Sequence, residues 1–277
     1  MKNVAILGLG IVGSRARQRL IDANYTVTCW SRTQRGREGE KESPEEAVAG
    51  AALVSIFLKD APMVREIFSR VLPELQEGAV VLNHATVDLE TTLWLAEQCA
   101  AKGHDFIDAP FTGSKDAATA GQLLYYTAGD ESLIASLSDY LAVSSKGSIY
   151  CGEIGTATVT KLGTNLISAC TIQAMSEAMA IAVKYGVKPE VFAEAATRNT
   201  SGSTLMATKY PRMIEGVYDA HFTLENMLKD SRYAIELGDA SEIDIPAIKL
   251  VSQRMAQLCE IGYADLDFSA LAKAYER

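Results

Sequence analysis

The chain has 277 residues and a formal net charge of -9 at pH 7, and 48% of its residues are hydrophobic. This length suffices for one large domain or two of ordinary size, each with a packed core. The negative charge argues against nucleic acid or an anionic membrane as the main partner. The composition is typical of a water-soluble enzyme.

The cysteine, histidine and apolar patterns exclude several further classes. The five cysteines lie far apart without a C-x-x-C pair, which predicts reduced thiols and a cytoplasmic protein. The three histidines are scattered, so we expect no metal site. Glycines interrupt the apolar run that follows Lys2, and arginines come directly after it, unlike a secretory signal. We expect no membrane-spanning helix, because no run of about twenty apolar residues is apparent.

A glycine-rich turn opens the chain. The apolar run Val4–Leu7 is followed by Gly8-Leu9-Gly10-Ile11-Val12-Gly13 and then by the helical pattern Ser14–Leu20. In such a G-x-G-x-x-G turn, the first glycine permits the tight turn, the second admits a pyrophosphate, and the third lets the helix pack on the strand. The helix N-terminus adds unpaired N–H donors. The order of strand, turn and helix predicts a dinucleotide site, and the alternative is an ordinary tight strand–helix turn.

The second predicted strand, Thr26–Trp30, indicates which dinucleotide binds. It is followed by Ser31, Arg32 and Thr33, where chains that bind NAD usually carry an acid for the ribose 2′-OH. A hydroxyl and a guanidinium suit a 2′-phosphate instead, so we predict NADPH as the cofactor. Arginines in polar loops are common, so the prediction rests on Arg32 alone. The charged segment Gln34–Glu42 is expected to be a solvated surface loop.

Short β-type runs alternate with helical patterns through the first half. Further strands are expected at Ala52–Leu58, Ala79–Asn83, Asp105–Asp108, Leu123–Thr127 and Ser148–Cys151. Helices are expected at Pro44–Ala49, Pro62–Val71, Leu89–Ala101 and Glu131–Leu141. This alternation predicts an α/β fold with a Rossmann-type, doubly wound parallel sheet. The strands are apolar on both faces, as buried parallel strands are.

The second half carries helical patterns only. Thr156–Tyr185 is a long helical stretch without proline, and four more follow at Glu190–Ala196, Thr204–Ile214, Thr223–Leu237 and Pro246–Ile261. We therefore predict an NADP-binding Rossmann domain over residues 1–160 and an all-α domain for substrate binding and oligomerisation over residues 161–277. The long helix joins the two. Its many alanines and methionines offer more apolar surface than one small domain can bury, which predicts a homodimer or homotetramer.

Three further segments could carry chemistry. Asp108–Ser114 places Gly113 between the hydroxyls of Thr112 and Ser114, which could donate to a carboxylate, although the segment could equally be a simple turn. Within Gly155–Asn165, Lys161 and Asn165 are four apart and therefore share one helix face. The third segment is the pair Lys229-Asp230, which taken alone would be unremarkable.

Together these segments resemble the β-hydroxyacid dehydrogenase family, which includes 3-hydroxyisobutyrate dehydrogenases and glyoxylate/succinic semialdehyde reductases. The family pattern is a glycine turn, a D-A-P-V-S-G motif, a G-x-x-x-K-x-x-x-N helix start and a K-D pair. Here Asp108–Gly113, Gly155–Asn165 and Lys229-Asp230 follow the glycine turn in that order. The resemblance covers nearly the whole chain. It implies a Rossmann domain followed by a helical domain.

The resemblance also implies the roles of several residues. Lys161 is the expected catalytic residue, Asn165 helps to hold it or the substrate, and Thr112 and Gly113 bind the substrate carboxylate. We expect the carboxylate site to extend over the Thr112–Ser114 segment, so that it includes Ser114. A hydride delivered to a carbonyl leaves an alkoxide, which needs a proton donor. A lysine desolvated in a cleft has a lowered pKa and can act as that general acid. The alternative for Lys161 is a surface lysine at a helix start, a position that the helix dipole disfavours.

Four more cofactor contacts follow from the resemblance. It places Leu58 and Lys59 beside the cofactor, Thr86 near the nicotinamide ribose, and Lys229 against the nicotinamide. The chain departs from the family pattern at Ala85, Val12 and Thr112, where serine, methionine and serine are usual. The sequence Gly113-Ser114-Lys115 resembles the glyoxylate/succinic semialdehyde reductase branch.

These observations predict an NADPH-dependent reductase of small aldehyde- or keto-acids, with Lys161 as the general acid. Two alternatives stay open because similarity of fold does not fix function. One is an imine reductase of the same architecture, which usually lacks the lysine. The other is a non-catalytic protein that binds NADPH as a sensor or scaffold. We expect a small carboxylate-bearing substrate as the partner, and neither nucleic acid nor a membrane.

Overall fold

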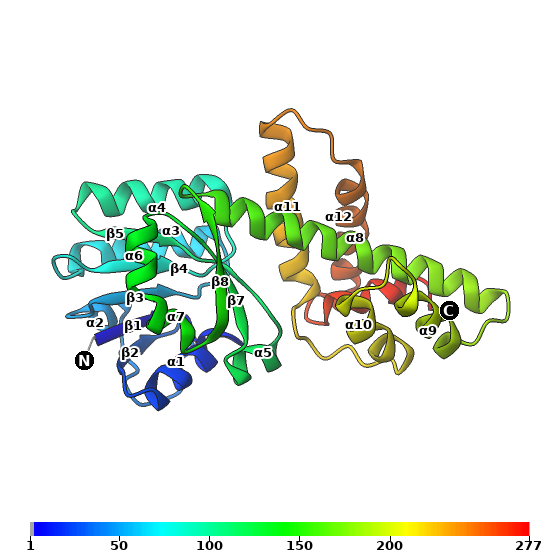
Figure 1. The fold of residues 1–277 in the computed structure, drawn as a ribbon, viewed down its shortest axis with the longest axis horizontal. Helices are drawn as coiled ribbons and strands as arrows, with labels where there is room; N and C mark the ends of the chain where they lie inside the picture. The colour runs from blue at the N-terminus through cyan, green and yellow to red at the C-terminus, as the bar shows by residue number, and fades with distance from the viewer. Residues whose placement is uncertain (1–2, 277) are drawn as a thin grey trace. The chain divides into compact units, whose positions relative to one another are not determined.

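The computed structural model describes residues 3–276 (Figure 1). The chain divides into two compact units, an N-terminal unit that ends at Lys161 and a C-terminal unit that begins at Leu162. The sequence placed the domain boundary at residue 160. Each unit is described by itself below.

One eight-stranded sheet forms the centre of the N-terminal unit. Its strand order is β2-β1-β3-β4-β5-β7-β6, and β8 pairs with β7. The strands are β1 (Asn3–Leu7), β2 (Thr26–Trp30), β3 (Leu53–Ile56), β4 (Val80–Asn83), β5 (Asp105–Asp108), β6 (Phe111–Thr112), β7 (Leu123–Ala128) and β8 (Ser145–Gly152). Strands β1 to β5 are parallel, with Val4 opposite both Val27 and Leu53. Their carboxyl ends therefore meet at one edge.

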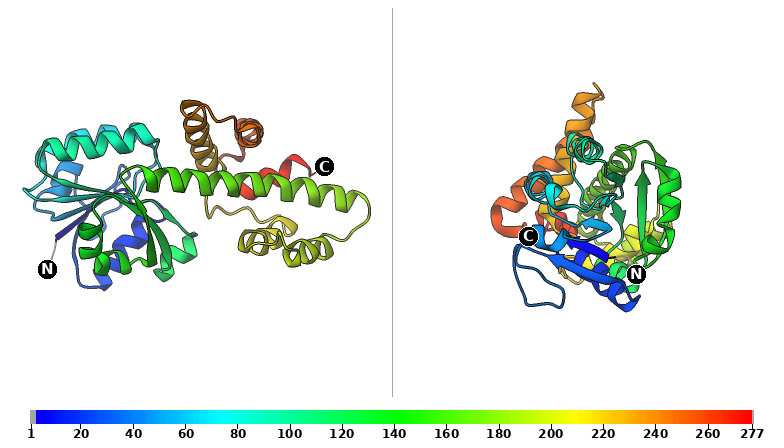
Figure 2. Two further views of the ribbon diagram at one scale, coloured as in Figure 1. Left: turned by 45° about the horizontal axis from the view of Figure 1, so that its top comes forward. Right: turned by 90° about the vertical axis from the view of Figure 1, so that its left-hand side faces the viewer.

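Helices cover both faces of this sheet, as the doubly wound prediction requires. They are α1 (Gly13–Asp22), α2 (Pro44–Val48), α3 (Ala61–Val71), α4 (Leu89–Ala101), α5 (Lys115–Ala120), α6 (Glu131–Ser136) and α7 (Ser138–Ala142). Helices α1, α6 and α7 share one hydrophobic core with the sheet, and α3 packs with α4 on the opposite face (Figure 2). Side chains cap the N-termini of several, for example Asp60 of α3 and Asp88 of α4.

The sheet is mixed rather than wholly parallel, which corrects one detail of the prediction. Strand β7 runs antiparallel to β5, with Asp108 opposite Ala128. The connection between them holds the two-residue strand β6 and the six-residue helix α5, which reverse the chain instead of forming a full crossover. Strand β6 pairs antiparallel with β7 (Phe111 opposite Tyr125). The predicted helix Glu131–Leu141 is also interrupted, at Leu137.

The C-terminal unit is helical, as predicted. Its helices are the remainder of α8 (Thr156–Lys184), α9 (Pro189–Arg198), α10 (Thr204–Ile214), α11 (Leu224–Ala240) and α12 (Pro246–Leu258), followed by a π-helical turn (Cys259–Tyr263) and a 3₁₀ segment (Phe268–Ala274). Ala169, Ile172 and Met175 of α8 lie in its core. Asp267 organises that core, because its buried carboxylate lies 2.6 Å from Lys209 Nζ and accepts the N–H groups of His221 and Ser269.

Helix α8 corrects the expectation about membrane-spanning segments. Its most apolar stretch has a mean hydropathy of 1.5, so by length and composition alone the helix could cross a membrane. The argument from length was therefore wrong. Asn165, Gln173 and Ser176 are nevertheless buried along it. These buried polar side chains favour a core helix of a folded unit over a membrane-spanning helix. Only 28% of the apolar stretch is buried, so one face of α8 is open.

A buried carboxylate fixes the start of α8 to the sheet. Asp108, the last residue of β5, accepts hydrogen bonds from the backbone N–H and the hydroxyl of Thr158, both at 2.9 Å. Thr92 of α4 lies 2.9 Å from the same hydroxyl. Burial raises the pKa of Asp108 to about 6, although the bonds from Thr158 and from the Gly155 N–H oppose this increase. A negative charge in the first turn also suits the helix dipole.

We expect Asp108→Asn to change how stability depends on pH. The folded-state pKa lies above the unfolded value, so the folded protein binds more protons between pH 4 and pH 6. The quantity to compare is the free energy of unfolding, wild type minus variant. This difference should fall by about 3 kcal/mol as the pH rises through this window. Urea denaturation at several pH values measures it.

Two controls accompany this measurement. Asp108→Ala leaves the buried Thr158 donors unpaired and should lower the free energy of unfolding by about 2 kcal/mol at pH 7.5. Asp105→Ala removes an exposed carboxylate from the same strand and should change it little. A difference between wild type and Asp108→Asn that is independent of pH would contradict the assigned titration.

Candidate active site

The glycine turn lies between β1 and α1, and packing explains two of its glycines. A Cβ on Gly8, whose φ is +102°, would lie 2.5 Å from the Phe57 carbonyl oxygen. A Cβ on Gly13 would lie 2.1 Å from the Gly8 carbonyl oxygen, so the helix could not approach the strand. A Cβ on Gly10 would meet none of the described atoms within 4 Å. Packing within the protein therefore does not require glycine at position 10. The absence of a side chain there leaves open space beside the turn.

The N-terminus of α1 is open to an anion. Val12 occupies the N-cap position, and no side chain of the described residues caps the helix. Leu9 is buried beneath the turn, whereas Gly10 and Ile11 are exposed. Ser14 N–H and Arg15 N–H donate to the Gly10 and Val12 carbonyls, so the N–H groups of the turn itself and the helix dipole are what could hold a pyrophosphate there.

The segment after β2 presents one exposed guanidinium. Arg32 and Thr33 are exposed, while the Ser31 hydroxyl donates to the Thr33 carbonyl at 2.8 Å. Ser31 therefore shapes the turn, and Arg32 faces solvent. The segment Gln34–Glu42 lies at the surface as predicted, since each of its residues is exposed or half-buried, but part of it pairs with β2. Strand β2 lies at the edge of the sheet, so the outward-facing backbone groups of Cys29 have no neighbouring strand. They form hydrogen bonds with the backbone of Gly39 and Lys41 instead.

The loops after β3 and β4 hold the other predicted cofactor contacts of this unit. Leu58 is buried, Lys59 is exposed and Thr86 is half-buried. All three follow the carboxyl end of a parallel strand, as the glycine turn does. This common edge is where doubly wound sheets bind their ligands.

His84, which the sequence did not single out, connects these loops. Its ring stacks on Phe57 at 4.5 Å between centroids. Its Nδ1 lies 2.7 Å from the Ala109 carbonyl, so Nδ1 carries the proton, and Nε2 accepts from the Ser55 hydroxyl at 3.1 Å. Burial lowers the pKa of His84 to about 4, although the bond to Ala109 opposes this decrease, so the ring is neutral at pH 7. In the sequence, only the position of His84 directly after a predicted strand could have suggested a role for it.

The predicted substrate segment lies next along the same edge. Thr112 belongs to β6 and is half-buried, and Gly113 is exposed with a φ of +136°. Ser114 Oγ accepts the Ala117 N–H at 3.2 Å and thereby caps α5. Its hydroxyl proton is not used in that bond. The segment thus brings two hydroxyls and a glycine together, and Asp108 anchors its beginning.

Lys161 and Asn165 lie one turn apart on the same face of α8, and each is only 8% exposed. Thr158, which Asp108 holds, lies within a turn of Lys161. Asn165 Nδ2 donates to Asp230 Oδ2 at 2.7 Å. Asp230 therefore fixes the orientation of the Asn165 amide.

Lys229 belongs to the same cluster as Asn165. Its Nζ lies 2.7 Å from Asp230 Oδ1 and 5.0 Å from the centre of the Tyr233 ring. The sequence identified the K-D pair but assigned a role to Lys229 alone. The structure shows that Asp230 is the buried acceptor between Lys229 and Asn165. The fact that an acid follows Lys229 directly was the available signal.

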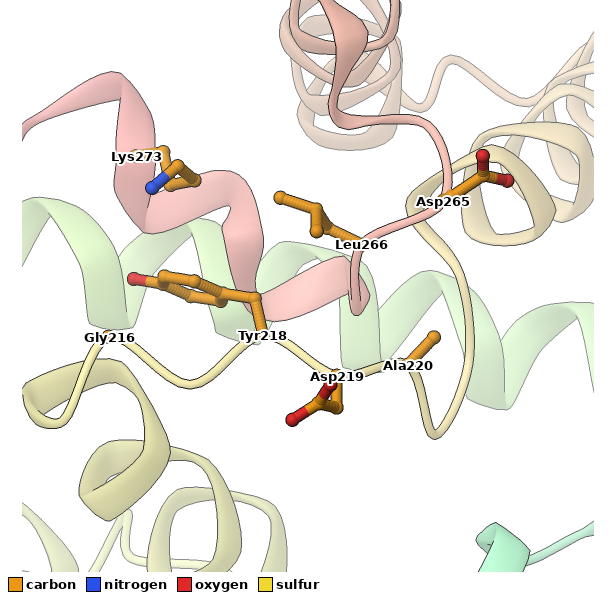
Figure 3. A pocket seen from close by; sticks show the side chains of 7 residues that line it. All are labelled: Gly216, Tyr218, Asp219, Ala220, Asp265, Leu266 and Lys273. Carbon is orange, nitrogen blue, oxygen red and sulfur yellow. The ribbon is translucent and has the colours of Figure 1, made fainter.

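A surface hollow of about 440 Å³ lies elsewhere in the C-terminal unit. It is lined by Gly216, Tyr218, Asp219, Ala220, Asp265, Leu266 and Lys273 (Figure 3). The Tyr218 hydroxyl donates to Glu276 at 2.6 Å, and Lys273 Nζ lies 3.1 Å from the same carboxylate. These groups are paired within the protein, and none of the predicted site residues lines the hollow.

Across residues 3–276, no group of three histidine, cysteine or acidic side chains has the arrangement of a metal site. The N-terminal unit offers instead a glycine turn, the hydroxyls of Thr112 and Ser114, and the buried Lys161. A lysine can protonate a developing alkoxide without a metal ion. The arrangement therefore suits hydride transfer between a dinucleotide and a small carbonyl compound.

Comparison with known proteins places these features in one family. Residues 3–162 match the profile described as the NAD binding domain of 6-phosphogluconate dehydrogenase. Residues 155–275 match the profile described as NAD-binding of NADP-dependent 3-hydroxyisobutyrate dehydrogenase. Glyoxylate/succinic semialdehyde reductase 1 of Arabidopsis thaliana is 30% identical over 98% of this chain and 97% of its own length.

Solved structures share the fold. The structure of a Mycobacterium tuberculosis 3-hydroxyisobutyrate dehydrogenase with L-serine has a TM-score of 0.92, with 23% identity over 100% of both chains. An imine reductase from Bacillus cereus has a TM-score of 0.62, with 21% identity over 100% of both chains. At these identities the likeness concerns the fold alone. The two profiles and the plant reductase show that the chain belongs to the β-hydroxyacid dehydrogenase family, whose members are NAD(P)-dependent oxidoreductases.

Proposed function

We propose that the protein is an NADPH-dependent reductase that converts a small aldehyde- or keto-acid to the hydroxy acid. The observation that carries this proposal is Lys161, buried on α8 one turn from an asparagine whose amide a carboxylate orients. A lysine in that setting is a suitable proton donor for the alkoxide that hydride transfer produces.

The chain's own residues account for binding and proton transfer. NADPH, when bound, supplies the hydride. The hydroxyls of Thr112 and Ser114 and the backbone at Gly113 hold the substrate carboxylate. Lys161 donates a proton to the oxygen of the developing alkoxide, and Asn165 positions the reacting groups. Asp108 acts through Thr158, because it fixes the helix turn that carries Lys161.

The preference for NADPH rests on Arg32. It is exposed just after β2, where a guanidinium can form charge-assisted hydrogen bonds with a 2′-phosphate. The carboxylate that would select NAD at the end of β2 is replaced here by Ser31. Leu58, Lys59, Thr86 and Lys229 stay predicted cofactor contacts.

The substrate class follows from the family branch. Gly113-Ser114-Lys115 resembles the glyoxylate/succinic semialdehyde reductases, and one such plant enzyme matches nearly the whole chain. We therefore propose glyoxylate and succinic semialdehyde as the first substrates to test. All five cysteines are unpaired, which supports a reducing compartment such as the cytoplasm.

The second candidate is an imine reductase, because an enzyme with that activity shares the fold. Lys161 argues against it, because imine reductases of this architecture usually lack that lysine. A protein that binds NADPH without turnover is the third candidate. The buried Asn165–Asp230 hydrogen bond argues against that one, because a protein without turnover has no need to orient the amide.

We also propose that the C-terminal unit associates with a second copy. Seven large apolar side chains among the described residues of this unit are 44–66% exposed: Ile167, Ile181, Val183, Val191, Ile243, Leu250 and Ile261. Ile167 and Ile181 lie four helical turns apart and so share the open face of α8. Together the seven side chains could supply much of the ~800 Å² that each partner buries in a standard interface.

The substitution Lys161→Ala should lower kcat with glyoxylate or succinic semialdehyde by about a hundredfold or more, because it removes the general acid. The Kd for NADPH should change less than about twofold. Initial rates of NADPH and NADH oxidation measure the first effect and cofactor fluorescence the second. Lys184→Ala, at the exposed end of the same helix, is the matched control.

Each outcome separates the candidates. Turnover of an imine with an unchanged rate in Lys161→Ala would favour the imine reductase. Binding of NADPH without turnover of any carbonyl acid or imine would favour the sensor. A wild type that prefers NADH would contradict the argument from Arg32.

The paired substitution Ile167→Asp and Ile181→Asp should convert an oligomer to monomers, because charges on the open face of α8 cannot be desolvated in an interface. Sedimentation velocity at micromolar concentration measures the change. Ile149→Asp, at an exposed position of β8, should leave the assembly intact. A monomeric wild type would contradict the proposal.

A further inference from the structure

The segment that follows Arg32 is folded against β2. Cys29 N–H donates to the Gly39 carbonyl at 2.9 Å, and Lys41 N–H donates to the Cys29 carbonyl at 2.8 Å. Gly39 has a φ of +72°, and a Cβ there would lie 2.3 Å from the Val27 carbonyl oxygen. Only glycine allows this approach. We call residues 31–41 the ribose loop.

One buried carboxylate holds the ribose loop together. The Glu40 side chain is 2% exposed. Its Oε2 accepts the N–H of Arg35 at 3.0 Å and the N–H of Arg37 at 2.9 Å, while Oε1 lies 3.4 Å from Ser31 Oγ. Burial by itself would raise the pKa of Glu40, but these backbone bonds hold it below its ordinary value. The side chain is therefore an anion at pH 7.

Two further side chains tie the ribose loop to its surroundings. Gln34 Nε2 donates to the carbonyls of Ser31 and Lys41, at 3.1 and 3.0 Å. The buried Arg17 guanidinium donates to the Glu38 carbonyl. Arg17 lies on α1, the helix that begins at the glycine turn. The loop is thus fixed both to β2 and to the helix of the pyrophosphate site.

This folding decides which groups face solvent. The guanidiniums of Arg32 and Arg35 are exposed, whereas the Glu40 carboxylate is turned inward and its acceptor sites are filled. An acid at the end of β2 would ordinarily bind a ribose diol and repel a phosphate. Here the acid near the end of β2 is Glu40, and its carboxylate binds backbone N–H groups of the ribose loop instead.

We propose that Glu40 is a positioning residue that determines cofactor specificity. It folds the ribose loop before the cofactor binds, so that Arg32 and Arg35 stand ready for the 2′-phosphate of NADPH. This inference rests on the proposed preference for NADPH. A loop that is already ordered does not lose conformational freedom on binding, so the phosphate contacts contribute more of their energy to affinity.

Removal of Glu40 distinguishes this idea from simple electrostatics. Loss of a negative charge near a phosphate site would, through charge alone, tighten the binding of NADPH. The proposal requires the opposite sign, because the loop loses its central acceptor. NADH has no 2′-phosphate, so its affinity should depend little on the loop.

The experiment compares Glu40→Ala with two matched variants, by titration of NADPH and NADH at one ionic strength. In Glu40→Ala the Kd for NADPH should rise about tenfold and that for NADH less than about twofold, corresponding to the loss of two charge-assisted bonds. Glu40→Gln should restore NADPH affinity, because its amide oxygen can accept both N–H groups. Glu42→Ala removes an equal charge from an exposed neighbour and should not weaken NADPH binding.

The outcomes separate this inference from the proposed function. A wild type that prefers NADH overturns the proposed cofactor itself. A wild type that prefers NADPH, together with a Glu40→Ala variant that binds NADPH as tightly or more tightly, overturns the role of Glu40. An equal loss for both cofactors does the same, since it indicates general damage. If Glu40→Ala is unstable, Glu40→Asp should give a smaller loss that is again confined to NADPH.

Discussion

The contact between Asp108 and Thr158 is the constraint on which the catalytic arrangement depends. It joins the end of a central strand to the first turn of α8, and Lys161 follows within one turn. A lysine side chain is long and flexible, so only a fixed backbone can hold its ammonium at a defined place. The carboxylate therefore acts on the chemistry through helix geometry. The cost of burying it appears as its raised pKa of about 6.

Buried polar groups with fixed partners recur among the candidate site residues of both units. His84 accepts from Ser55 and donates to Ala109, which ties the loops after β4 and β5. Asp230 accepts from Asn165 and pairs with Lys229. A buried polar group without partners would be costly, so each such group fixes the atoms around it. The loops at the carboxyl edge of the sheet are therefore ordered by the interior beneath them.

The sequence predicted those features that depend on local patterns. The glycine turn, the alternation of strands and helices, and the bounds of α4 and α10 follow from residue spacing and capping. It did not predict β6 and α5 or the reversal of β7. Those features depend on which distant segments pair, as when Phe111 lies opposite Tyr125. His84 and Asp230 were missed for the same reason, because their roles lie in partners far along the chain.

A chain with a net charge of -9 can still attract an anion locally, where particular acids turn inward and cations stay exposed. Asp108, Glu40 and Asp230 each have a buried side chain and spend their acceptors on backbone N–H groups, a hydroxyl, an amide or a lysine. Screening confines the remaining surface charge to about 8–10 Å at ordinary ionic strength. The field at the cofactor end is thus set by exposed groups such as Arg32 and by the uncapped start of α1. Local arrangement, rather than net charge, decides which anion the site attracts.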